Sequence, residues 1–181
     1  MPKDLLGPLI TSKTRLKLLL RFFVNQELGG YLQGLSKELE ENTNSVRVEL
    51  NRLEGAGIIQ SNTEGRRKIF RVNPSHPLVP DLTSIIRKVT GIDAVVERVV
   101  DRAGKDLRQV WICGKLAQGI DSNEIEVLLI GEAFDMDYLA QLMPKVEQHI
   151  NKSISYFVAP QASETQKESC LLVWEKQGRK I

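Results

Sequence analysis

Residues 43–59 read TNSVRVELNRLEGAGII, and this stretch decides what fold the first part of the chain is expected to have. Three apolar residues in it recur at helical spacing and so share one face: Val46, Leu50 and Leu53. The spacing predicts a helix from Thr43 to Gly55, with Asn42 as its cap and Gly57 ending it. The opposite face of this helix is polar, which is typical of a helix that meets solvent or a charged partner.

Two helices are expected before this one and a hairpin after it. The first runs from Ser12 to Asn25, and the second is a short helix around Leu35. Ile58-Ile59 and Lys68–Val72 are expected to form two short strands, with a turn between them at Ser61–Gly65. Three helices followed by a hairpin is the order of a winged helix-turn-helix.

A proline-rich segment, Asn73–Pro80, divides the chain. Its three prolines remove backbone donors and fix φ, so no regular element is expected to run through it. Beyond it, amphipathic helices alternate with strands expected at 110–113, 127–130, 154–158 and 170–174, which indicates an α/β or α+β fold. The expected organisation is a winged helix-turn-helix over residues 1–74, a linker with a connecting helix over 75–91, and an α/β domain over 92–181.

Composition argues against several classes of protein. Cys113 and Cys170 lie far apart in apolar runs, without CxxC spacing, so we expect reduced, buried thiols and no metal site. No apolar run is long enough to span a bilayer and no cleaved leader is recognisable, so a soluble cytoplasmic protein without membrane contact is expected. His76 and His149 have no convincing partner for acid–base chemistry, and no catalytic residue is predicted.

Positive charge is concentrated in the first half of the chain. Residues 1–74 carry 12 lysines and arginines against 8 acidic residues, whereas the rest of the chain carries 13 against 15. Attraction to a polyanion such as nucleic acid would therefore come from the first half. Lys13, Arg15 and Lys17 on the first helix add to this charge and are secondary candidates for phosphate contacts.

The candidate DNA contacts lie on the polar face of the third helix and in the basic cluster at the expected hairpin tip. They are Asn44, Ser45, Arg47, Val48, Asn51, Arg66, Arg67 and Lys68. A helix that enters the major groove offers short polar or basic side chains near its N-terminus, and phosphate stabilises consecutive cations at a tip. The alternative is a solvated surface, which Glu49 and Glu54 favour because they lower the positive charge of the helix.

The runs Leu35–Leu39 and Asn44–Ile59 resemble the ArsR-like winged-helix regulators. The resemblance covers most of the first 74 residues and implies a transcriptional regulator that binds double-stranded DNA. Winged-helix regulators commonly bind paired half-sites, so a homodimer is expected. Metal-sensing members carry a cysteine pair near the recognition helix, and the first 74 residues contain no cysteine, so metal sensing by that route is not expected.

The segments Gly114–Gly119 and Ser122–Gly131 are similar to the site motif of polymerase-β-like nucleotidyltransferases. In that family a Gly-Ser turn holds phosphate, and two acids at alternate strand positions bind Mg²⁺ on one face. The resemblance implies that the corresponding residues here are Gly114, Lys115, Glu124 and Glu126.

This sequence departs from the nucleotidyltransferase pattern at several positions. Lys115 replaces the phosphate-contacting serine, Gln118 replaces an arginine, and the two acids are glutamates rather than aspartates. The third acid would fall near Ser155 or Tyr156, and neither supplies a carboxylate. We therefore expect a degenerate domain that transfers no phosphoryl group and needs no cofactor.

The most consistent interpretation is a DNA-binding transcriptional regulator whose C-terminal domain serves dimerisation, a nucleotide or protein effector, or another partner. One alternative is an active Mg²⁺-dependent nucleotidyltransferase that uses Glu124 and Glu126. Another is an antitoxin-like protein that binds a partner. The two glutamates also fit the polar edge of a strand that faces solvent and binds no ligand.

Overall fold

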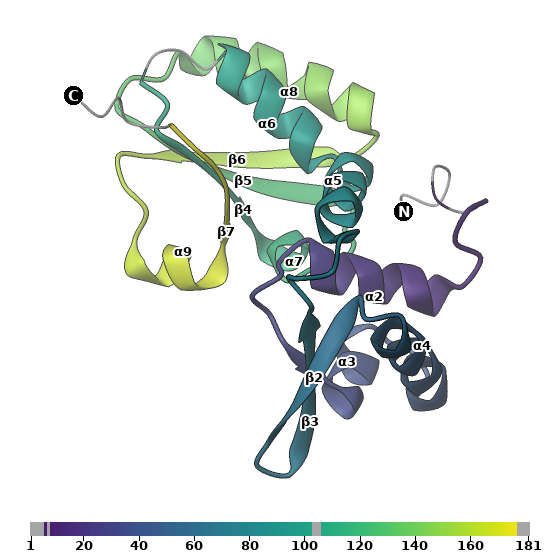
Figure 1. The fold of residues 1–181 in the computed structure, drawn as a ribbon. Helices are drawn as coiled ribbons and strands as arrows, with labels where there is room; N and C mark the ends of the chain where they lie inside the picture. The colour runs from purple at the N-terminus through teal and green to yellow at the C-terminus, as the bar shows by residue number, and fades with distance from the viewer. Residues whose placement is uncertain (1–5, 7, 103–105, 177–181) are drawn as a thin grey trace. The chain divides into compact units, whose positions relative to one another are not determined.

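The computed structural model describes residue 6, residues 8–102 and residues 106–176 (Figure 1). The chain divides into two compact units. The first comprises residues up to Val89 together with Gln118–Asp121, and the second comprises Thr90–Ala117 together with the residues from Ser122 onward. Within the described part of the chain, no helix has both the length and the apolar character that a membrane span requires.

The first unit combines helices with a small antiparallel sheet. Its elements are α2 (Lys13–Phe23), β1 (Gly30–Tyr31), α3 (Leu32–Glu38), α4 (Thr43–Gly55), β2 (Ile59–Glu64), β3 (Arg67–Val72) and α5 (Val79–Thr90). The strand order is β1-β3-β2. The three expected helices and the hairpin are present in the expected order, and β1 adds a short strand that the sequence did not indicate.

Local sequence accounts for the positions of the helices. The Ser12 side chain caps α2 by accepting from the Arg15 amide at 3.2 Å, and Asn42 caps α4 by accepting from the Asn44 amide at 2.8 Å. The apolar faces of α2, α3 and α4 then meet in one core, in which these side chains are at most 1% exposed: Leu18, Phe22, Leu35, Val46 and Leu50. The bounds of α4 are those that the sequence predicts.

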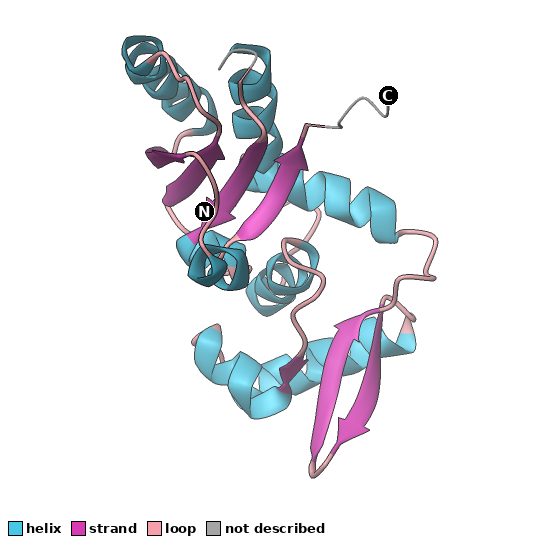
Figure 2. Cartoon of the chain, turned by 90° about the vertical axis from the view of Figure 1, so that its left-hand side faces the viewer, coloured by secondary structure: helices cyan, strands magenta, loops and turns pink. Residues whose placement is uncertain are grey.

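The hairpin is longer than expected. Residues 61–64, expected as a turn, continue β2, and the pairing of Glu64 with Arg67 leaves Gly65 and Arg66 as the loop (Figure 2). Gly65 has a φ of +60°, which favours glycine in a two-residue hairpin loop. The strand was expected at Ile58-Ile59, but its continuation was not predicted, because its residues beyond Ile59 are polar and mostly exposed and lack the alternation that marks a half-buried strand.

The proline-rich segment is also shorter than expected. Helix α5 begins at Val79, so Pro80 lies in its first turn, where an amide has no helical acceptor in any case. The expectation that no regular element includes residues 73–80 is therefore wrong for the last two of them.

The second unit is built on a mixed, four-stranded sheet with strand order β6-β5-β4-β7. Its elements are α6 (Ile92–Arg102), β4 (Gln109–Cys113), α7 (Gly114–Ala117), β5 (Glu124–Ile130), α8 (Met136–Ile150), β6 (Ser153–Ala159), α9 (Glu164–Ser169) and β7 (Leu171–Glu175). Strand β6 is parallel to β5, and the other pairs are antiparallel. The four expected strands are present, with β7 at an edge, and the mixed α/β class is confirmed.

The two faces of this sheet are covered differently. Side chains alternate along β5, so Ile125, Val127 and Leu129 share one face, and Leu128 and Ile130 share the other. Helices α6 and α8 lie on one side of the sheet, and α9 lies on the opposite side (Figure 1). On the α9 side a small apolar cluster forms from Trp111, Leu128, Ile130 and Ala162.

The two cysteines contradict the expectation of reduced, buried thiols. Cys113 and Cys170 form a disulfide across 57 positions of sequence, with their Cα atoms 4.3 Å apart. Cys113 ends β4 and Cys170 directly precedes β7, so the pairing of these two strands brings the sulfur atoms together. Both residues are half-buried. The prediction was wrong because it took separation in sequence for separation in space, whereas the last described strand pairs with the first strand of its own unit.

Candidate nucleic-acid interface

Helix α4 presents the predicted contact residues on its outer face. All five of them are exposed: Asn44, Ser45, Arg47, Val48 and Asn51. The inner face holds the three apolar residues that the helical spacing indicated, Val46, Leu50 and Leu53, at 0%, 1% and 6% exposure. The cap at Asn42 fixes where the helix begins, so the predicted contacts occupy its first three turns.

A hollow of about 300 Å³, here called the wing hollow, lies between α4, the start of α3 and the β2–β3 hairpin. Four basic residues line it: Arg47, Arg66, Arg67 and Lys68. Asn51 lines it as well, so five of the eight predicted contact residues meet at this one place. None of the described residues lining the wing hollow is acidic, and its charge therefore suits an anionic ligand.

Aromatic rings hold two of the basic side chains of the wing hollow. The guanidinium carbon of Arg67 lies 4.4 Å from the centroid of the Tyr31 ring, and the Lys68 Nζ lies 4.9 Å from that of Phe70. Both distances fall within the range of cation–π attraction. Arg67 is exposed, so the ring of Tyr31 positions a guanidinium that remains accessible to solvent.

The basic cluster is not entirely at the hairpin tip, where the sequence placed it. Gly65 and Arg66 form the loop, whereas Arg67 and Lys68 belong to β3. The Lys68 Nζ lies 2.7 Å from a carboxylate oxygen of Glu54, and the hydroxyl of Ser61 donates to the other oxygen. These hydrogen bonds, the one from Lys68 first, lower the pKa of Glu54. The ion pair thus joins α4 to the hairpin and offsets part of the charge of Lys68.

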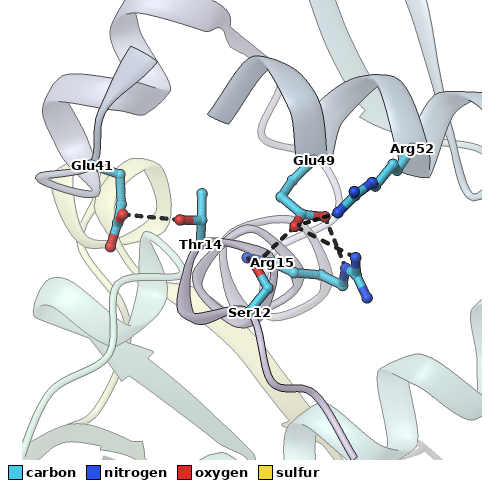
Figure 3. Close-up of polar contacts among 6 residues, drawn as sticks. All are labelled: Ser12, Thr14, Arg15, Glu41, Glu49 and Arg52. Atoms are coloured by element: carbon cyan, nitrogen blue, oxygen red, sulfur yellow. Dashed lines mark hydrogen bonds and ion pairs between the residues drawn. The ribbon is translucent and has the colours of Figure 1, made fainter. Parts of the chain in front are cut away.

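Glu49 does not lie on the outer face of α4, where it was expected to weaken the positive charge. It is 5% exposed and packs between α4 and α2 (Figure 3). Its carboxylate accepts hydrogen bonds from Arg15 Nε at 2.8 Å, from Ser12 Oγ at 2.8 Å and from Arg52 Nη1 at 3.2 Å. Burial opposes ionisation, but the hydrogen bonds from Arg15 and Ser12 outweigh it and lower the pKa of Glu49.

Helical spacing alone could have predicted that Glu49 lies at the edge of the buried face of α4. It stands three residues after Val46, at the margin of the buried face, where a charged side chain needs a partner from a neighbouring helix. Charge counting treated it as part of the polar face instead.

Arg15, Lys17 and Arg21 of α2 are also engaged inside the first unit, each in an ion pair with a glutamate. The Lys17 Nζ lies 2.7 Å from a carboxylate oxygen of Glu41 and donates to the Leu39 carbonyl at 2.7 Å. Thr14 Oγ1 donates to the same carboxylate at 2.9 Å (Figure 3). The hydrogen bond from Lys17 is the main reason that the pKa of Glu41 is lowered. Lys17 therefore fastens α2 to the segment before α4 and is a poor candidate for a phosphate contact.

A second hollow, of about 410 Å³, lies on the other side of α4 and is lined partly by α2. The three remaining predicted residues of the helix line it: Asn44, Ser45 and Val48. The predicted contacts of α4 thus form a ridge between two hollows, of which only the wing hollow is lined by several cations.

In the second unit, the four residues predicted from the resemblance to nucleotidyltransferases come together only in part. Gly114 and Lys115 begin α7 directly after β4, and Gly114, at a φ of +63°, lies so close to the Glu126 carboxylate that a Cβ would overlap it. Glu126 pairs with Ser155 of β6, and Glu124 pairs with Ser153. The neighbouring strand thus offers hydroxyl groups beside both glutamates. Among the described residues, no group of three or more His, Cys, Asp or Glu side chains is arranged to hold a metal ion.

Comparison with known proteins gives partial structural likeness only. No family model and no curated protein sequence matches the chain. Reduced HlyU from Vibrio cholerae N16961 is 14% identical with a TM-score of 0.38, over 50% of this chain and 87% of that one. AF1382 from Archaeoglobus fulgidus is 18% identical with a TM-score of 0.38, over 51% of this chain and 96% of that one. The transcriptional regulator BldR from Sulfolobus solfataricus is 16% identical with a TM-score of 0.38, over 55% of this chain and 70% of that one.

Proposed function

We propose that this protein is a DNA-binding transcriptional regulator that holds duplex DNA between α4 and the β2–β3 hairpin. The observation that carries the proposal is the convergence of Arg47, Arg66 and Arg67 on one hollow without an acidic residue in its described lining. Cations gathered in this way repel one another unless a polyanion neutralises them, and a duplex offers phosphates at regular spacing.

In this proposal α4 enters the major groove and the hairpin contacts the DNA backbone. Arg47 is suited to pair with guanine, Asn51 with adenine, and Val48 to contact a thymine methyl group. Arg66 and Arg67 bind phosphate and so contribute affinity without reading sequence. Glu49 and Glu54 support this arrangement by fastening α4 to α2 and to the hairpin.

We assign DNA binding to residues 1–74, a connecting role to residues 75–91, and dimerisation, effector or partner binding to residues 92–181. We expect a homodimer, because winged-helix regulators commonly bind paired half-sites. We place the protein in the cytoplasm, where a regulator meets DNA.

We also propose that the second unit is a nucleotidyltransferase-like domain without transferase activity and without a cofactor. The closeness of Gly114 and Glu126 supports the likeness, because the family brings its glycine turn beside its acidic strand. The serine beside Glu126 on β6 supports the loss of activity, since phosphoryl transfer depends on charge neutralisation by acid-bound metal ions.

The test measures binding of the full chain to a random duplex pool at several salt concentrations. Arg66→Ala with Arg67→Ala should weaken binding to all sequences and reduce the slope of log K against log salt by about two. Arg47→Ala should relax the base preference at one position instead. Arg71→Ala is the matched control, because Arg71 lies on the same strand outside the wing hollow and pairs with Glu64. Binding that is absent, or that falls equally in the control, would refute the proposal.

A further inference from the structure

The segment Pro160–Cys170, here called the strap, crosses the face of the second unit's sheet opposite α6 and α8 (Figure 1). It leaves β6, forms α9 and returns to the sheet as β7. Beneath it lie Trp111, Leu128 and Ile130, which are 8%, 2% and 4% exposed. The strap therefore keeps a small apolar surface of the sheet out of water.

Among the described residues, few non-covalent contacts hold the strap to the sheet. Helix α9 has no buried residue. Ala162 is the buried strap residue of the apolar cluster, and the half-buried Cys170 packs against it. At the start of the strap, Arg108 Nη2 donates to the Pro160 carbonyl at 2.6 Å. The capping box of α9 and the ion pair between Lys167 and Glu164 lie inside the strap, so they stabilise its helix without attaching it to the sheet.

The disulfide is the attachment at the other end. Cys170 is the last residue of the strap, and Cys113 is the last residue of β4. Neither cysteine is fully buried, and α9, which precedes Cys170, is largely exposed, so a small thiol can reach the bond. A single covalent bond thus fixes a segment that buries little apolar surface of its own.

We propose that the Cys113–Cys170 disulfide is a reversible redox clasp that holds the strap over the sheet and releases it on reduction. A thiolate of a dithiol reductant attacks one sulfur, giving a mixed disulfide and a free cysteine thiolate, which takes up a proton. The second thiolate of the reductant then displaces the other cysteine. In sum the protein disulfide gains two electrons and two protons, and the dithiol becomes a disulfide.

Release joins the apolar surface beneath the strap to an apolar side chain that is already exposed. Phe157 of β6 pairs with Leu128, so both side chains point to the same face of the sheet, and Phe157 is already 59% exposed. With the strap displaced, Trp111, Leu128, Ile130 and Phe157 form one continuous apolar face, whose size then depends on the redox state of the clasp. This inference goes beyond DNA binding, because it makes the exposed surface of the second unit depend on a redox reaction.

Limited trypsin digestion of the full chain, with and without dithiothreitol, tests the clasp. Lys167 lies in the strap, and Lys145 of α8 is a matched control, being an exposed lysine in a helix of the same unit. Reduction should accelerate cleavage after Lys167 by about tenfold or more and leave cleavage after Lys145 unchanged, because cleavage follows the population of the open segment. Reoxidation should restore slow cleavage.

The variant Cys113→Ser with Cys170→Ser should be cut after Lys167 at the rate of the reduced protein, whether or not dithiothreitol is present. Equal cleavage rates of oxidised and reduced wild-type protein would show that other contacts hold the strap, and would overturn the proposal. So would parallel acceleration at Lys145, because the disulfide would then stabilise the whole unit rather than one segment. The wild-type comparison decides the matter even if the double variant does not fold.

Discussion

Replacing Glu49 by glutamine is the sharpest test of how α4 is held in place. The substitution keeps the shape of the side chain but removes the charge to which Arg15, Arg52 and Ser12 donate. One carboxylate oxygen becomes an NH₂ group, which cannot accept these hydrogen bonds. The contact between α2 and α4 should therefore weaken while the apolar core beside it stays intact.

The burial of Glu49 sets the size of the effect. A hydrogen bond to a charged group contributes about 1.5–3 kcal/mol, and breaking a fully buried ion pair costs about 3–5 kcal/mol. Here the side chains of Arg15 and Arg52 are 35% and 61% exposed, so both can turn to water. The expected loss of unfolding free energy is thus about 1–3 kcal/mol at neutral pH.

Urea unfolding followed by circular dichroism measures this loss. With a denaturant slope of about 2 kcal/mol per M, the midpoint should fall by about 0.5–1.5 M. Glu27→Gln, which changes an exposed acid of the same unit, should leave the midpoint unchanged. Equal midpoints for the Glu49 and Glu27 variants would refute the reasoning.

The pH dependence of this effect has a definite sign. The folded protein lowers the pKa of Glu49 below its ordinary value of 4.5, so the unfolded chain binds the proton more readily. The stabilisation is complete above that ordinary value and is lost as pH falls through the lowered pKa. The difference between wild type and Glu49→Gln should therefore shrink in acid.

Three further predictions concern the candidate interface and the second unit. Tyr31→Ala removes the ring beneath the Arg67 guanidinium and should weaken DNA binding, measured by fluorescence anisotropy, about two- to fivefold, the equivalent of about 0.5–1 kcal/mol. Tyr31→Phe keeps the ring and should leave binding unchanged. Equal losses of affinity in the two variants would exclude the ring as the positioning group. Glu54→Gln frees Lys68 from its ion pair and should steepen the salt dependence of binding by about one unit of slope; an unchanged slope would mean that Lys68 meets no phosphate. Incubation with Mg²⁺ and labelled nucleoside triphosphates should transfer no label, and transfer that Glu124→Gln abolishes would contradict this.

The sequence was most informative where local spacing and local capping act together. Helix α4 begins and ends where its apolar spacing and Asn42 place it, because both signals lie within one segment. Residues 61–64 of β2 were mistaken for a turn because they are polar on both faces of the strand. The disulfide and the partners of Glu49 depend on contacts between segments distant in the chain, and periodicity carries no information about those.

In the candidate site, too, features set within one segment could be predicted and contacts between distant segments could not. Exposure of the α4 residues could be predicted from their helical phase, whereas the concentration of basic residues at one hollow depends on how the hairpin folds back beside α4. Lys68 shows the limit of charge patterning. It was counted with its neighbours at a tip, yet its position on β3 brings it to Glu54.

The pairing of β4 with β7 has a consequence for synthesis of the chain on the ribosome. The strands of the first unit all lie between Gly30 and Val72, so that sheet can close while the rest of the chain is still being made. The second sheet cannot, because the neighbour of β4 is the last described strand, some sixty residues later. Until Leu171–Glu175 emerges, the edge of β4 that contains Trp111 has no partner strand. A nascent chain paused before that point should therefore be especially prone to aggregate or to recruit a chaperone.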